Sequence, residues 1–357
     1  SNAQNTVVAR NIIGLNAQAS AKVGNGSYGI YLPNGNNSVI GGNGIGNVIA
    51  GNGQDGIFIS GSSTNNAIYG NFIGVNQSGS SNLGNSMFGY LIESELKAIE
   101  TLLVAPKTNE YGRADQAAAW TLLAKLYLNA QTYTGTDRNT DCVTYCKKVI
   151  DAGFTLSPNY SHLFLRDNDN NDEIIFAVRF DGNTGRSWGG MTFLVHAPVG
   201  GTMSASQFGI NGGWAGLRTT PEFVSKFSDI TGNTDTRAMF HTDGQSLEID
   251  DVFNFTNGYA ITKYKNVDVN GVAGSDASGN WVDNDFPMFR LADVYLMYAE
   301  AVKRGGGGGD EATALGYLNA LRERAYGNTS GNLTTYDLNL ILDERARELY
   351  WEGHRRT

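Results

Sequence analysis

Two tryptophans lie beside glycines in polar segments, and these residue types suit the binding of a sugar. Trp188 is followed by two glycines, and Trp214 is preceded by two. A flat indole ring can cover the C–H face of a pyranose, while planar polar groups bind its hydroxyls. Glycine neighbours let a ligand approach closely. We predict Trp214 and Trp188 as ligand-binding residues, with Asn211 and Arg218 as hydroxyl partners. The alternative is that these tryptophans only fill the domain interior.

A run of acidic and amide residues at positions 167–172 could hold a metal ion. Asp167, Asp169 and Asp172 alternate there with asparagines, which gives the density of oxygen ligands found in calcium loops. The run lacks the glycine and the later glutamate of an EF-hand. We therefore predict a structural calcium at these three aspartates, with a solvated acidic turn as the alternative.

The sequence shows no catalytic motif. Hydrolysis of a glycosidic bond requires two carboxylates that flank the scissile bond, and the carboxylates here follow no such pattern. The first 92 residues carry only Arg10, Lys22 and Asp55 as charged side chains, too few for a polysaccharide-cleaving surface. Cys142 and Cys146 have no further ligands at metal-binding spacing, so we interpret them as small buried hydrophobes. The protein is predicted not to be an enzyme.

The overall charge limits the classes of ligand. The chain has 357 residues and a formal net charge of −9, with an isoelectric point near 5.0. Such a chain lacks the basic surface that nucleic acids and anionic membranes require. Neutral ligands such as sugars are compatible with it. Residues 1–3 resemble the remnant of a cleaved tag, so the N-terminus indicates nothing about localisation.

Residues 4–92 are rich in glycine and asparagine and contain internal repeats. The segment at 11–16 returns at 71–76, sixty positions later, and the segments at 23–25 and 28–29 return at 83–85 and 88–89. Short β-branched runs separated by Gly and Asn indicate short strands and tight turns. Repetition of such a unit is typical of a right-handed parallel β-helix, in which each coil buries its apolar face against the next.

From Glu93 onward the apolar residues follow a helical period. Helices are predicted from 93 to 103, 113 to 130 and 140 to 152, and again from 288 to 301 and 337 to 352. Paired helices with alternating small and large apolar residues are typical of tetratricopeptide-like hairpins. Between them, residues 155–285 are aromatic and irregular. On the last helix, Glu344, Arg345, Arg347 and Glu348 have the i,i+3 and i,i+4 spacing of helix-stabilising charge pairs.

Several long strings in this part resemble the SusD/RagB family. They are FRLADVYLMYAEA (289–301), LNALRERAYG (318–327) and ILDERARELYWEGHRR (341–356), together with YGRADQAAAWTLLAKLYLNA (111–130) upstream. The resemblance covers residues 93–357. It implies a mainly α fold, with a tetratricopeptide-like scaffold and an irregular ligand-binding half at 155–285. The β-helical segment at 4–92 stands in front of it.

The resemblance also implies a function. Members of this family are lipid-anchored proteins of the Bacteroidetes outer membrane, which bind glycans at the cell surface and work beside a TonB-dependent, SusC-like transporter. It therefore predicts non-enzymatic binding of a glycan, with a starch-like α-glucan favoured, and it supports the predicted calcium. The family pattern is incomplete at both ends, without the signal peptide and lipidated cysteine. The chain is accordingly interpreted as composite: a natural fusion, an engineered fusion or an assembly error. A structural or interaction protein without an intact ligand site is the alternative function, followed by a β-helical polysaccharide-degrading enzyme.

Overall fold

The computed structural model describes residues 4–79 and 87–354 and divides into two compact units. One unit consists of Ser1–Ile99 with Leu126–Arg138, and the other of Glu100–Lys125 with Asn139–Thr357. The predicted tag remnant at 1–3 and the predicted repeat at 83–85 lie outside the described residues. The predicted domain boundary between residues 92 and 93 falls inside helix α1 (Met87–Glu100) and stays a prediction.

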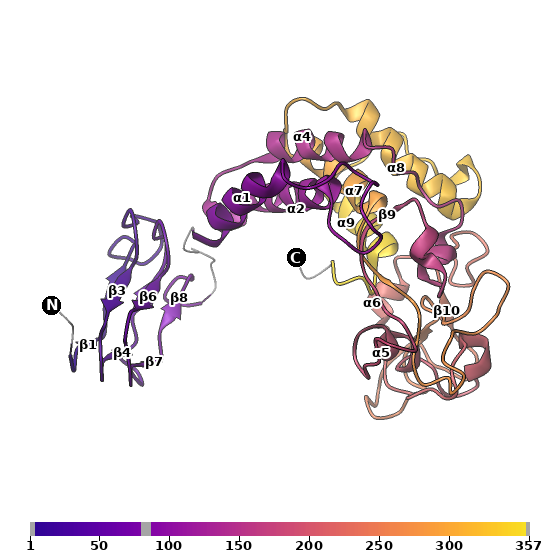
Figure 1. Ribbon diagram of the computed structural model, residues 1–357, viewed down its shortest axis with the longest axis horizontal. Helices are drawn as coiled ribbons and strands as arrows, with labels where there is room; N and C mark the ends of the chain where they lie inside the picture. The colour runs from indigo at the N-terminus through magenta and orange to yellow at the C-terminus, as the bar shows by residue number, and fades with distance from the viewer. Residues whose placement is uncertain (1–3, 80–86, 355–357) are drawn as a thin grey trace. The chain divides into compact units, whose positions relative to one another are not determined.

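Short strands of the smaller unit pair in parallel (Figure 1), each with a strand that lies 24 to 36 positions away in the sequence. The described residues form three such sheets: β1 (Val7–Val8), β4 (Val39–Gly41) and β7 (Ala67–Tyr69); β2 (Ile12–Ile13), β5 (Val48–Ile49) and β8 (Phe72–Ile73); and β3 (Ile30–Pro33) with β6 (Ile57–Ser60). Ile40, Ile49 and Ala50 are buried between them. The parallel pairing agrees with the predicted coils, and the right-handed β-helix itself stays a prediction.

An asparagine ladder and close glycine contacts explain the composition of this unit. Asn11 Nδ2 donates to Asn47 Oδ1 at 3.0 Å, and Asn47 Nδ2 donates to Asn71 Oδ1 at 2.9 Å. The ladder satisfies polar groups at equivalent turns of successive strands. A Cβ atom on Gly46 would lie 1.6 Å from the Gly70 carbonyl oxygen, so only glycine fits there.

The predicted repeat extends too far towards the C-terminus. Residues 87–92 belong to helix α1 (Met87–Glu100), so the copy of the repeat expected at 88–89 is helical rather than extended. Residues 90–100 contain neither glycine nor asparagine, which the tight turns of another coil would require. Leu96 on this helix is buried.

The larger unit is built on packed helices. They are α2 (Gln116–Leu128), α4 (Asn139–Ile150), α7 (Leu291–Lys303), α8 (Glu311–Tyr326) and α9 (Leu338–Leu349). The last three residues of α2 and all of α3 (Ala130–Thr134) belong to the smaller unit. Helix α7 packs against α4, α8 and α9, and it is therefore almost entirely buried. Asp310 and Asp337 cap α8 and α9 by accepting from the backbone N–H of Thr313 and Leu340. The predicted mainly α fold is confirmed, and the arrangement is consistent with a tetratricopeptide-like scaffold.

The predicted irregular region contains short elements around a second apolar core. Strand β9 (Ile174–Val178) pairs antiparallel with β12 (Phe286–Arg290), and β10 (Phe240–His241) pairs antiparallel with β11 (Ala260–Ile261). The helices are α5 (Gly190–His196) and α6 (Pro221–Val224), with 3-10 turns at η1 (Tyr160–Phe164), η2 (Asn168–Asn170), η3 (Ala205–Phe208) and, after α8, η4 (Thr329–Gly331). Their core includes Tyr160, Phe164, Met191 and Ile261.

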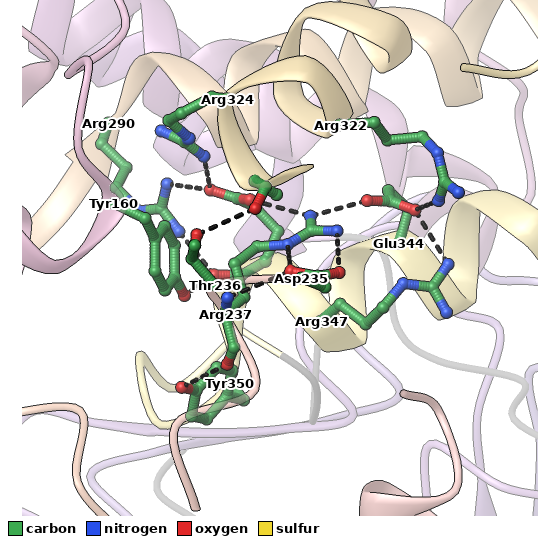
Figure 2. A network of polar contacts seen from close by, with 12 residues as sticks. Tyr160, Asp235, Thr236, Arg237, Arg290, Arg322, Arg324, Glu344, Arg347 and Tyr350 are labelled. Carbon is green, nitrogen blue, oxygen red and sulfur yellow. Dashed lines mark hydrogen bonds and ion pairs between the residues drawn. The ribbon is translucent and has the colours of Figure 1, made fainter. Parts of the chain in front are cut away.

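Helix α9 contributes carboxylates to a buried ion network, which the prediction of helix-stabilising charge pairs did not include. Glu344 Oε1 lies 2.6 Å from Arg237 Nη1, and Glu348 Oε1 lies 2.6 Å from Arg290 Nη1 (Figure 2). These four side chains are fully buried. The i,i+3 pair between Glu344 and Arg347 does form, at 2.8 Å, but it belongs to this tertiary network.

The network joins distant segments of the larger unit. Asp235, Glu173, Arg322, Arg324, Glu352 and Lys263 complete it. Arg290 contacts three carboxylates at once, those of Glu173, Glu348 and Glu352. It therefore connects the end of β12 to the start of β9 and to α9. Burial of so many charges is costly unless each is paired, which is the case here. The network therefore sets how the helices meet the irregular region.

Candidate functional site

Helix α5 and its preceding turn position the first aromatic residues of the candidate site. Gly190 begins the helix with φ +57°, and a Cβ atom there would lie 2.4 Å from the Phe180 ring. Glycine is therefore required at this turn. Trp188 lies immediately before the helix, and Phe193 lies within it. Both rings are exposed at the surface, by 55% and 41% respectively.

Aromatic rings from three segments come together at this point. The ring centroids of Trp188 and Trp214 are 6.1 Å apart, those of Trp188 and Trp281 are 4.2 Å apart, and those of Phe193 and Trp214 are 6.0 Å apart. Trp214 is 41% exposed, and Trp281 is half-buried. We call the rings of Trp188, Phe193, Trp214 and Trp281 the aromatic surface. Large apolar rings left in contact with solvent commonly mark a binding surface.

The buried side chain of His196 supports the aromatic surface by packing against Trp214. Its ring stacks on Trp214 with centroids 5.0 Å apart, and it is buried. Its Nδ1 lies 2.7 Å from the Gly212 carbonyl oxygen, and its own carbonyl accepts from the Trp214 backbone N–H at 3.0 Å. Burial lowers the pKa of His196, which favours the neutral ring, and the Gly212 carbonyl can accept from Nδ1 only in the tautomer with the proton on Nδ1. These contacts hold the Trp214 indole in place.

The two predicted polar partners differ in what they can offer a ligand. Asn211 Nδ2 donates to the Ser278 carbonyl at 2.8 Å and to Asn280 Oδ1 at 2.7 Å, so its amide oxygen is the atom suited to a sugar hydroxyl. Arg218 donates to three backbone carbonyls, those of Asn257, Gly216 and Val252. It therefore holds its loop together. A ligand-binding role for both residues stays a prediction.

Sequence reasoning missed Trp281, Phe193 and His196 as members of this site. Trp281 follows Gly279 and Asn280, the same kind of polar, glycine-containing context that singled out the other tryptophans. That signal could have found it. Phe193 and His196 lie in a short apolar segment that gives no indication of a site, so only the tertiary structure reveals them.

The predicted calcium ligands do not converge. Asp172 Oδ1 lies 2.9 Å from Lys107 Nζ, and Asp167 Oδ2 accepts from the Val269 backbone N–H at 3.5 Å. In the part of the chain that the structure describes, no three His, Cys, Asp or Glu side chains are arranged to hold a metal ion. A calcium ion at Asp167, Asp169 and Asp172 therefore stays a prediction.

The cysteines behave as the sequence predicts. Cys142 and Cys146 are fully buried on α4, with their Sγ atoms 3.9 Å apart. Burial raises the pKa of the Cys146 thiol well above its usual value, which keeps it protonated and unreactive. Among residues 4–79 and 87–354, no helix is long and apolar enough to cross a membrane.

Comparison with known proteins agrees with the resemblance in the sequence. Residues 249–357 match the SusD family. The starch-binding protein SusD of Bacteroides thetaiotaomicron is 34% identical over 323 residues, a match that covers 77% of this chain and 56% of that protein. The SusD-like protein P25 of Formosa agariphila is 26% identical, with 69% of this chain and 49% of that protein covered. The chain thus spans about half the length of these relatives.

Solved structures share the fold. Surface glycan-binding protein A from Bacteroides thetaiotaomicron, in complex with laminarihexaose, aligns with a TM-score of 0.58 at 22% identity, over 77% of this chain and 61% of that one. A SusD superfamily protein from Parabacteroides distasonis aligns with a TM-score of 0.55 at 24% identity, over 73% and 55% of the two chains. These structures show the shared fold. The sequence matches show that this chain contains a SusD family domain over residues 249–357 and that SusD proteins are its homologues.

Proposed function

We propose that this protein binds an oligo- or polysaccharide without cleaving it, and that the aromatic surface is the binding site. The observation that carries the proposal is the convergence of aromatic rings from three separate segments, with Trp188, Phe193 and Trp214 exposed. Ring faces supply apolar contact with sugar C–H groups, and the Asn211 amide oxygen lies in the same segment as Trp214. The name of the starch-binding relative supports a starch-like α-glucan as the first ligand to test.

The cellular setting is also part of the proposal. We infer that the protein acts at the outer surface of the cell, held by a lipid anchor, and passes its glycan to a SusC-like, TonB-dependent transporter. The family resemblance supports this setting. A right-handed β-helix formed by the N-terminal coils is proposed on the parallel strand pairing and the asparagine ladder.

Binding is best tested by affinity electrophoresis of the folded protein in gels that contain single polysaccharides. The panel includes starch and laminarin, an α- and a β-glucan, because relatives are named for starch binding and for a laminarihexaose complex. Retardation by one glycan identifies the ligand class. No retardation by any member would favour a structural or interaction protein. A reducing-sugar assay on the same mixtures tests the remaining alternative, an enzyme.

Replacing Trp214 with alanine is expected to weaken glycan binding by roughly 1–3 kcal/mol, or about five- to 150-fold, because a ring at the centre of the aromatic surface is lost. Calorimetric titration with the retarding oligosaccharide measures the change. Phe253→Ala is the matched control, since this ring is 95% exposed and lies outside the aromatic surface. Equal affinities for Trp214→Ala and the unaltered protein, with both folded, would exclude Trp214 from the site.

A further inference from the structure

The two ends of the parallel stack carry similar local sequences. Strands β2 and β8 are the outermost strands of one sheet, and they lie in the matching segments 11–16 and 71–76. Strands β1 and β7 are the outermost strands of the neighbouring sheet. Val7 precedes Ile12 by as many positions as Ala67 precedes Phe72, so the first and last coils have the same spacing between their strands.

Both ends expose apolar side chains. At the first end, Val7 is 66% and Ile12 is 39% exposed. At the other end, Phe72 and Ile73 are exposed by 41% and 46%, and Ile68 and Tyr69 are exposed to a similar extent. The middle strands β4 and β5 bury Ile40, Val48 and Ile49 instead. Outermost strands with exposed apolar residues and unprotected edges are templates for pairing with another chain.

The asparagine ladder has a direction, which makes the two ends complementary. Asn47 accepts from the backbone N–H of Asn11 at 3.0 Å, and Asn71 accepts from that of Asn47 at 2.9 Å. In each step, the earlier coil donates and the Oδ1 of the later coil accepts. If the ladder continued by one step, the Asn71 N–H would donate to an asparagine Oδ1 in the next coil. The coil at the other end of the described stack, which contains β2, presents that group at Asn11.

The backbone pairing also repeats from coil to coil, and here the N–H of the later coil donates to the carbonyl of the earlier one. Val48 N–H donates to the Asn11 carbonyl, and Phe72 N–H donates to the Asn47 carbonyl, each at 2.8 Å. The next donor in this series must follow an asparagine in its own sequence, and it must pair with Phe72 as Phe72 pairs with Val48. Ile12 of a second molecule has both properties, and its Val7 would then lie beside Ala67.

We propose that the end formed by β7 and β8 binds the end formed by β1 and β2 of a second copy of this chain. The copies associate head to tail, with the first coil of one molecule continuing the ladder of the other. Such an interface is heterologous and does not close on itself, so it produces longer assemblies as the concentration rises. Arg10, Lys22 and Asp55 are the only charged residues from 4 to 79, so little charge opposes the contact.

Sedimentation velocity over a concentration series tests the proposal on the full chain. We expect the weight-average sedimentation coefficient to rise with concentration for the unaltered protein. Ile12→Lys and Ile73→Lys each place a charge on one end and are expected to remain monomeric alone. Leu342→Lys adds the same charge at a residue of α9 that is 51% exposed, and it is expected to associate like the unaltered protein. Circular dichroism verifies that each variant is folded.

Mixing the two end variants separates head-to-tail association from other arrangements. Ile12→Lys keeps an intact β8 end, and Ile73→Lys keeps an intact β2 end, so an equimolar mixture is expected to form dimers and nothing larger. If either variant dimerises alone, the contact joins like ends and the proposal is overturned. A monomeric unaltered protein at every concentration would overturn it equally. Should a variant fail to fold, the concentration series of the unaltered protein still decides.

Discussion

Replacing Arg290 with methionine is expected to destabilise the larger unit by roughly 3–5 kcal/mol, the usual effect of breaking a fully buried ion pair. Arg290 is fully buried and contacts three carboxylates, those of Glu173, Glu348 and Glu352. Without the guanidinium, these charges would remain buried beside fewer partners. Urea unfolding followed by tryptophan fluorescence measures the loss. All five tryptophans lie in the segments of the larger unit, so the signal reports on that unit.

The control for this experiment is Arg304→Met. Arg304 forms an i,i+4 pair with Glu300 at 2.5 Å, but its side chain is 39% exposed. Exposed pairs contribute about 0–1 kcal/mol, so this variant should unfold close to the unaltered protein. The double variant Arg290→Met with Glu348→Gln should lose less stability than the sum of its single changes, because it removes one of the stranded charges. Equal midpoints for Arg290→Met and Arg304→Met would contradict the structural role of the network.

Lowering the pH is expected to destabilise the same unit, but only in strongly acidic solution. Burial disfavours the charged form of Glu344, yet Arg237, Arg347 and Arg322 outweigh burial and lower its pKa from 4.5 to about 2. The pKa of Glu348 is lowered as well, since Arg324, Arg290 and Arg237 outweigh its burial. Between pH 4.5 and about 2, the pKa values of Glu344 in the unfolded and folded chain, the unfolded chain binds more protons than the folded chain. The free energy of unfolding therefore falls as the pH falls.

The size of this effect follows from the shift. For Glu344 alone, a pKa lowered from 4.5 to about 2 corresponds to about 3 kcal/mol, present in full above pH 4.5 and lost towards pH 2. Urea unfolding at pH 7, 5, 4 and 2.5 measures it. Glu344→Gln should be less stable at pH 7 and show a flatter decline. Glu110→Gln, at an exposed pair with Arg113, should follow the unaltered protein. A free energy of unfolding that stays constant from pH 5 to 2.5 would argue against charged Glu344.

Local pattern was sufficient to predict elements whose residues are close in sequence. The alternation of β-branched residues with Gly and Asn predicts short parallel strands, because each coil repeats the same contacts with its neighbour. The helical period predicts α7 and α9, since their apolar residues recur every three to four positions. The long strings at 289–301 and 341–356 were enough to indicate the family, which the comparisons support.

Contacts between distant segments were decided by the tertiary structure. Glycine neighbours identify Trp188 and Trp214 one by one, but their meeting with Trp281 depends on how three loops pack. Glu344 and Glu348 have the spacing of helix-stabilising charge pairs, and only the position of α9 against Arg237 and Arg290 shows that they are buried. Spacing along a helix describes its own neighbours, whereas burial depends on what the rest of the chain places against it.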